Sequence, residues 1–115
     1  MKKAITETQK DFENSSSRIP EYLAWYRLFK REFTAFLKER GITEISFGKP
    51  NHFDMSGFFR KENQAYYFSI GDLRGFKDDM LIRTAKDFKD YTGGTNQSIL
   101  LKSVETFTDG FNRIA

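Results

Sequence analysis

Side chains able to do chemistry are few in this chain of 115 residues. There is one histidine, His52, and no cysteine, which removes disulfides, thiolate metal sites and cysteine nucleophiles. A catalytic dyad would need His52 close to Ser46 or Ser56, and the sequence around these serines shows no nucleophile elbow. We therefore interpret His52, which is next to a predicted turn, as a surface residue.

Several carboxylates gather around one predicted strand, over residues 80–85. A magnesium-dependent nuclease needs such groups to converge on one point, but aspartate is also common in turns and solvated loops. The pair Gly93-Gly94 is not followed by the lysine of a phosphate-binding loop and is typical of a turn. We expect a non-enzymatic protein without catalytic residues, metal or cofactor, and keep a metal-dependent enzyme as a weaker alternative. The carboxylates are Asp72, Asp78, Asp79, Asp87 and Asp90.

The clearest pattern is a predicted β-hairpin over residues 52–70. On either side of a polar turn, side chains of two kinds alternate, as they do in half-buried strands. If Phe59 pairs with Tyr66, then Phe58 and Tyr67 become neighbours on the outer face of the sheet. Such rings stack on the bases of single-stranded nucleic acid while nearby cations contact its phosphates. The alternative is that a helix or a second subunit covers the two rings.

A long amphipathic helix is predicted before the hairpin, beginning near Pro20 and ending at Gly41. Trp25 and Leu28 border its apolar face, where they either widen the core or contact a partner subunit, and we favour the core. The apolar face comprises Tyr22, Tyr26, Phe29, Phe33, Phe36 and Leu37. A basic stripe lies opposite, where it could track phosphates or simply be solvated. The stripe comprises Arg27, Lys30, Arg31 and Lys38.

A second amphipathic helix is predicted at the end of the sequence. Its start has two possibilities, because either Ser98 or Ser103 could cap it. In the second case residues 99–101 would be extended. The apolar stripe of this helix is Leu100, Val104, Phe107, Phe111 and Ile114.

These patterns predict a single α+β domain over residues 18–115, preceded by a mobile polar arm over 1–17. The domain would hold a four-stranded antiparallel sheet, a meander, packed against an N-terminal and a C-terminal helix. Besides the hairpin, the strands would be 42–47 and 80–85, with a polar loop over 86–97. One face of the sheet would be covered by one or both helices, and the other would be open to water or to a partner.

The chain is mildly basic, with a net charge of +3. Residues 1–41 hold nine Lys/Arg and six Asp/Glu, whereas residues 42–115 hold ten of each. This balance favours polyanion partners, although an ordinary soluble surface explains it as well. The N-terminus lacks the apolar core of a signal peptide, and no apolar run is long enough to cross a bilayer. We expect a cytoplasmic protein without a membrane partner.

The run from residue 66 to residue 114 has a distinctive order of elements. It holds a strand, an Asp-and-Arg turn with glycine, an apolar strand ending in a charged-aromatic segment, a glycine loop and an amphipathic helix. In this order it resembles the positive-cofactor-four family of transcriptional coactivators and single-stranded DNA-binding proteins. The resemblance implies a curved four-stranded antiparallel sheet followed by a helix, and a dimer. It also implies that Tyr67 stacks on a base, and that the backbone contacts are Arg74, Arg83, Lys86 and Lys89.

We therefore predict a small non-enzymatic single-stranded nucleic-acid-binding protein that uses an open sheet face and forms a homodimer. The basic helix stripe would be a second contact surface. The alternative is a protein-interaction or accessory dimer module of the phage or mobile-element type, which uses the same sheet face or Trp25 against a polypeptide. The predicted nucleic-acid contacts are Phe58, Arg60, Tyr67, Arg74, Arg83, Lys86 and Lys89.

Overall fold

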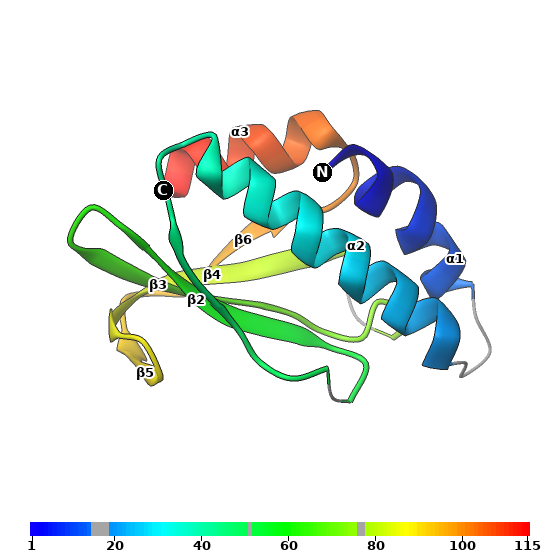
Figure 1. The fold of residues 1–115 in the computed structure, drawn as a ribbon, viewed down its shortest axis with the longest axis horizontal. Helices are drawn as coiled ribbons and strands as arrows, with labels where there is room; N and C mark the ends of the chain where they lie inside the picture. Colours follow the sequence, from blue (N-terminus) through cyan, green and yellow to red (C-terminus); the bar gives the residue numbers. More distant parts are fainter. Residues whose placement is uncertain (15–18, 51, 76–77) are drawn as a thin grey trace.

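The computed structural model describes residues 1–14, 19–50, 52–75 and 78–115. Helices lie over one face of an antiparallel sheet, so the predicted α+β class is confirmed (Figure 1). The helices are η1 (Ala4–Thr8), α1 (Gln9–Glu13), α2 (Ile19–Lys38) and α3 (Val104–Ile114). The strands are β1 (Glu44–Phe47), β2 (Met55–Lys61), β3 (Gln64–Ile70), β4 (Asp79–Asp87), β5 (Asp90–Gly93) and β6 (Gln97–Leu100).

The sheet has two more strands than the four predicted. Its order is β1-β2-β3-β4, and β5 and β6 both pair with β4. β6 pairs with the start of β4 and β5 with its end. Residues 86–97, predicted as a loop, therefore largely form a hairpin with the end of β4. The strand that returns along β4 is interrupted and consists of two short strands, β5 and β6. Strands this short, without a clear apolar alternation, leave little signal in a sequence, which explains the difference.

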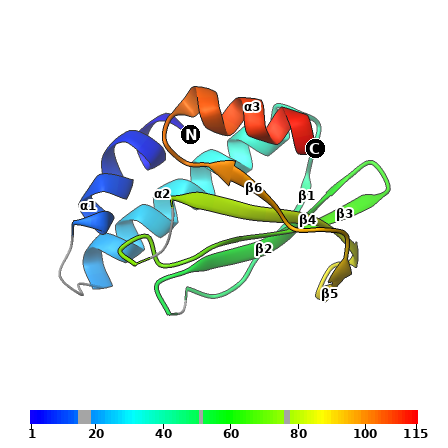
Figure 2. The same cartoon turned by 180° about the vertical axis from the view of Figure 1, so that it is seen from behind.

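The β4–β5 hairpin turns away from the helices, toward the other side of the sheet (Figures 1 and 2). Its tip contains Lys89 with a φ of 63°, and a β-bulge interrupts the pairing between Ala85 and Asp87. Bulges bend and twist a strand pair. Gly93 allows β5 to approach β4 closely, because a Cβ at this position would lie 1.8 Å from the carbonyl oxygen of Thr84.

The central hairpin has the predicted register. Phe59 pairs with Tyr66 and Phe58 pairs with Tyr67. Because side chains alternate along each strand, Phe59 faces the helices and Phe58 faces the other side. Phe59 is fully buried there.

The main core lies between the sheet and the helices, and Phe33 of α2 is at its centre. The centre of the Phe33 ring is 5.1 Å from that of Phe68 on β3 and 5.9 Å from that of Phe107 on α3. Trp25 has none of its surface exposed. The interpretation that Trp25 widens the core is therefore confirmed.

Gly41 terminates α2, as the sequence predicts. Gly41 has a φ of 76°. Its N–H donates to the carbonyl of Lys38, and the N–H of Ile42 donates to the carbonyl of Leu37, both at 3.0 Å. This pair of bonds is a Schellman motif, which satisfies carbonyls left free at a helix end. In the described part of the chain, neither α2 nor any other helix is long and apolar enough to span a membrane.

The start of α3 resolves the choice between two serine caps. The side chain of Ser103 accepts a hydrogen bond from the N–H of Thr106, and the hydroxyl of Thr106 accepts one from the N–H of Ser103. This reciprocal pair is a capping box. The residues before it are extended as β6, as expected for a cap at Ser103.

The N-terminal segment differs from the predicted mobile arm. Residues 4–13 are helical and pack on α2 through Ala4, Ile5 and Phe12, which are buried. Glu32 of α2 accepts hydrogen bonds from the backbone N–H groups of Ala4 and Lys3, at 2.7 and 3.3 Å. A carboxylate in this place satisfies the free donors of a helix start. The polar composition of this segment suggested an arm, but a few apolar side chains suffice to pack the helix against α2. Residues 15–17 of the predicted arm lie outside the described residues.

Candidate nucleic-acid interface

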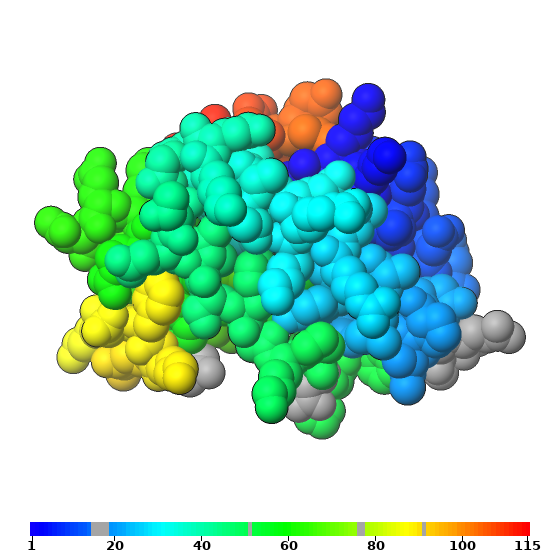
Figure 3. All heavy atoms as spheres, in the orientation of Figure 1, coloured from blue at the N-terminus to red at the C-terminus, as the bar shows by residue number. Residues whose placement is uncertain are grey.

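The outer face of α2 carries the predicted basic stripe. All four of its cations are exposed, and together they line a shallow depression of about 420 Å3. In Figure 3, α2 forms the near surface of the molecule, beside the connection between β1 and β2. The lining residues of this depression, which we call the α2 face, are Arg27, Lys30, Arg31, Thr34, Ala35 and Lys38.

A second depression, of about 360 Å3, lies between α2 and the β1–β2 connection. It continues from the α2 face, because Arg27 and Lys30 line both. The ammonium of Lys30 is 5.3 Å from the centre of the Phe47 ring, so a cation and an aromatic side chain meet here. The lining of this depression, which we call the α2–β1 groove, is Leu23, Tyr26, Arg27, Lys30, Phe47, Gly48, Lys49 and Pro50.

The acidic residues of α2 lie apart from the basic stripe. Glu21 and Glu32 share one flank of the helix, roughly 120–140° around the axis from Arg27 at 3.6 residues per turn. Glu32 is engaged with the start of η1. None of the carboxylates in the described residues lines either depression, and none of the ion pairs found there involves Arg27, Lys30, Arg31, Lys38 or Lys49. The charge of these cations is therefore available to an anion from outside.

The loop wall of the α2–β1 groove is fixed by two tyrosines of α2. The hydroxyl of Tyr26 donates to the carbonyl of Gly48, and that of Tyr22 donates to the carbonyl of Asp54, each at 2.5 Å. Burial, together with the nearby charge of Asp54, raises the pKa of Tyr26, which keeps its hydroxyl protonated as a donor. The two bonds hold both ends of the β1–β2 connection against the helix.

The predicted aromatic platform on the sheet is buried at Phe58 and half-buried at Tyr67. Phe58 and Tyr67 are neighbours, with ring centres 5.3 Å apart, but only 5 % of Phe58 is exposed. Phe88, at the tip of the β4–β5 hairpin, stacks on Phe58 with ring centres 5.8 Å apart. Together with Ala65 and Ala85, these rings form a small second core. The cover is thus a hairpin of the same chain, instead of the helix or second subunit considered above.

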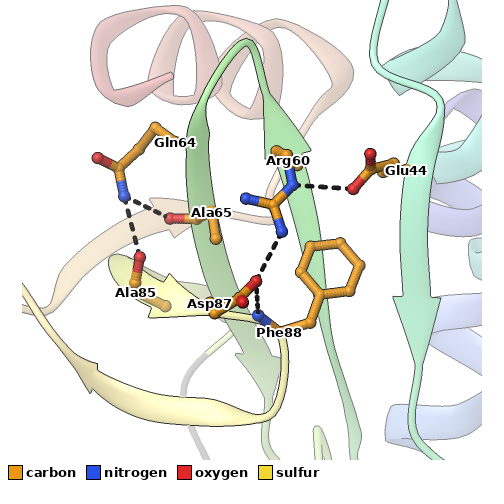
Figure 4. A network of polar contacts seen from close by, with 7 residues as sticks. All are labelled: Glu44, Arg60, Gln64, Ala65, Ala85, Asp87 and Phe88. Atoms are coloured by element: carbon orange, nitrogen blue, oxygen red, sulfur yellow. Dashed lines mark hydrogen bonds and ion pairs between the residues drawn. The ribbon is translucent and has the colours of Figure 1, made fainter.

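Arg60 holds this cover in place. Its guanidinium donates to Glu44 at 2.8 Å and to Asp87 at 2.6 Å (Figure 4), and it lies 5.1 Å from the centre of the Phe88 ring. The bond from Arg60, followed by one from the N–H of Phe88, lowers the pKa of Asp87. Arg60 therefore has two carboxylates as partners within the chain, which reduces its value as a phosphate contact.

The other predicted cations are dispersed. Arg83 lies over the Tyr67 ring at 4.8 Å and donates to Asn96 at 2.9 Å. Arg74 lies beyond the opposite end of β3 from Arg60 and donates twice to Asp72, at 2.7 and 3.0 Å. Lys86 and Lys89 are exposed on the β4–β5 hairpin. The structure brings Phe58, Arg60, Tyr67 and Arg83 together, and it separates Arg74 from them.

The aspartates do not converge on one point. Asp72 binds Arg74, Asp87 binds Arg60, and Asp90 accepts from the hydroxyl of Thr92 at 2.6 Å. Within the described residues, no three histidine or carboxylate side chains are arranged to hold a metal ion. His52 is exposed in a turn, with a φ of 54°, in agreement with its interpretation as a surface residue.

Four residues that matter here were missed by the sequence analysis: Phe47, Lys49, Pro50 and Phe88. Lys49-Pro50 has the composition of a turn, and nothing in the sequence shows that this turn lies against α2. The tyrosine-to-carbonyl bonds that place it there are contacts between distant residues. Phe88 stands in a polar segment between Asp87 and Lys89, where a lone aromatic side chain is a weak signal of a local cover.

Comparisons with protein-family models, with curated proteins and with solved structures gave no match for this chain. The resemblance of residues 66–114 to the positive-cofactor-four family stays a prediction.

Proposed function

We propose that this chain is a non-enzymatic single-stranded nucleic-acid-binding protein that contacts the phosphate backbone with the α2 face. The observation that carries this proposal is the set of exposed cations on α2, which have no carboxylate partner in the described residues. The aromatic platform on the sheet is a weaker candidate, because Phe58 is buried and Arg60 is engaged in ion pairs.

The spacing of the cations suits a polyanion that runs along the helix. Arg27 and Lys38 are eleven residues apart, which is about 16 Å of helix axis at 1.5 Å per residue. A row of this length can contact several phosphates in succession, because one strand of B-form DNA has a phosphate about every 3.4 Å of its axis. A small metabolite would fill only part of the row.

Salt dependence tests the proposal. For a single strand, the logarithm of the binding constant should fall with the logarithm of salt concentration by about 0.7 per phosphate contact. Four contacts predict a slope of about −3, measured by fluorescence anisotropy with a labelled single-stranded oligonucleotide. The double variant Arg27→Ala, Arg31→Ala should bind more weakly and reduce the slope by about 1.4.

A matched control removes the same charge elsewhere. Lys102→Ala with Arg113→Ala takes away two exposed cations near and on α3 and should leave the slope nearly unchanged. An equal loss in both double variants would mean that only net charge matters and that the α2 face is not the contact surface. The absence of oligonucleotide binding at low salt would overturn the proposal.

A protein-interaction module is the second candidate. It is favoured by Leu100 on β6, which is 48 % exposed at an edge of the sheet. Such a partner would be bound mainly by apolar contact and backbone pairing, so its affinity would change little with salt.

A further inference from the structure

We propose that the α2–β1 groove is a subsite for one unstacked nucleotide, with the base on its apolar wall and the phosphate on its cations. This inference rests on the proposed function and adds the reason for a single-strand preference. In a duplex the bases are paired and stacked, and extruding one of them costs free energy, so a groove on the protein takes up a base more readily from a single strand.

The groove has the two kinds of wall that a nucleotide needs. Phe47, Pro50 and Leu23 provide apolar surface, and Arg27, Lys30 and Lys49 provide cations around it. Its volume of about 360 Å3 is at the small end of ligand sites, which run from about 300 to 1,000 Å3. The groove therefore accommodates one nucleotide and leaves the rest of the strand to the α2 face, which it adjoins.

Phe47 is the stacking group of this subsite. Its ring is half-buried and packs edge-on against Phe68, with ring centres 5.6 Å apart and planes at 76°, so its orientation is set by the core. Lys30 lies over the ring at 5.3 Å. A cation–π contact at an exposed site is weak. The ammonium of Lys30 can therefore leave the Phe47 ring and bind a phosphate, while a base stacks on the ring in place of the ammonium.

The groove is preformed. The N–H of Gly48 donates to the carbonyl of Ser56 at 2.9 Å, and the hydroxyl of Tyr26 donates to the carbonyl of the same glycine. These bonds hold the loop that presents Lys49 and Pro50. A site that is already ordered loses less conformational freedom when it binds its ligand.

The test compares two oligonucleotides with equal phosphates, one with bases and one abasic. The wild-type protein should bind the strand with bases between roughly fivefold and 150-fold more tightly, because one stacked base is worth ~1–3 kcal/mol. Phe47→Leu keeps an apolar side chain but removes the aromatic face, so it should abolish this difference and leave the salt slope unchanged. Phe53→Leu is the control, because Phe53 is an aromatic residue of the same connection that does not line the groove.

A second variant guards against misfolding of the first. Leu23→Trp fills the groove from the helix side and leaves Phe47 in place, so it should produce the same selective loss while its thermal unfolding stays close to that of the wild type. Equal binding of the two strands by the wild-type protein overturns the subsite but leaves the α2 face as the contact surface. If neither strand binds, the proposed function and the subsite both fail.

Discussion

Phe58 contacts Phe88 on the side of the sheet away from the helices, and only 5 % of its surface is exposed. We predict that Phe58→Ala lowers the free energy of unfolding by about 3 kcal/mol, because removing a buried phenyl ring leaves a cavity. Urea unfolding measures this loss. The affinity for a single-stranded oligonucleotide, measured under conditions where the variant is folded, should not change. A loss below about 1 kcal/mol, combined with weaker binding, would restore Phe58 as a stacking residue.

Glu13 makes the stability of the N-terminal helix depend on pH. Burial of its carboxyl, and then its hydrogen bond with Asp78, raise the pKa of Glu13 from 4.5 to about 7. The folded state therefore binds this proton more tightly than the unfolded state does. The stabilisation is complete below pH 4.5 and is lost as the pH rises through about 7.

The variant Glu13→Gln removes this titration. Between pH 4.5 and 7, the wild-type protein should lose stability relative to the variant, by about 1 kcal/mol or less, because the carboxyl is partly solvated. Urea unfolding at a series of pH values measures the difference. Glu105→Gln, an exposed carboxylate of α3, is the control and should follow the wild type. Parallel curves for wild type and Glu13→Gln would contradict the prediction.

At the scale of elements, the β4–β5 hairpin covers the second core, and Gly93 allows its strand β5 to lie close to β4. A Cβ at this position would clash with the carbonyl of Thr84, so Gly93→Ala should push the hairpin off β4. We predict a destabilisation of about 1–3 kcal/mol, the usual effect of overpacking. Gly75→Ala is the matched control, because a Cβ there would meet no described atom within 4 Å. Urea unfolding that shows equal effects for the two variants would mean that the hairpin does not need this close approach.

The elements differ in how well the sequence predicts them, and the reason is the range of the interactions. α2 was predicted because its aromatic residues recur at helical spacing and Gly41 supplies the left-handed stop. The register of β2 and β3 was predicted because Phe59 and Tyr66 flank a short turn. β5 was missed, because its pairing with β4 depends on a bulge and on the space at Gly93. β6 was expected only as the extended residues 99–101, and its pairing with β4 was missed. These are contacts between strands and leave no periodic pattern.

The range of the interactions also decides how much of the candidate site the sequence predicts. The basic residues of α2 share one side of a helix, so their spacing alone brings them together. The sheet platform required knowledge of what lies above it, and Phe88 covers Phe58 only because the β4–β5 hairpin turns out of the sheet. The α2–β1 groove depends on Tyr26, whose bond to Gly48 joins residues 22 positions apart.

At the scale of the whole molecule, aromatic residues are concentrated in the core between the sheet and the helices. The predicted homodimer stays a prediction, and Trp25 is not available as a contact with a partner subunit because it is buried. Among the described residues, the large apolar side chains that remain exposed are Ile19 and Leu100, at 58 % and 48 %. Leu100 is in β6, which pairs only with β4 in the described structure.

We predict that two copies associate through the free edge of β6. An edge strand presents unpaired N–H and C=O groups to a second strand, and a two-fold axis would place the same edge of each copy in contact. Leu100 would then be covered, while the α2 face, which shares no residue with β6, would stay accessible to nucleic acid. Sedimentation equilibrium should show a dimer for the wild-type protein and a monomer for Leu100→Lys, because charge on an edge strand opposes pairing. Ile19→Lys, which adds the same charge at α2, should remain dimeric. A wild-type monomer at every concentration measured would count against the association, and loss of the dimer in both variants would place the interface elsewhere.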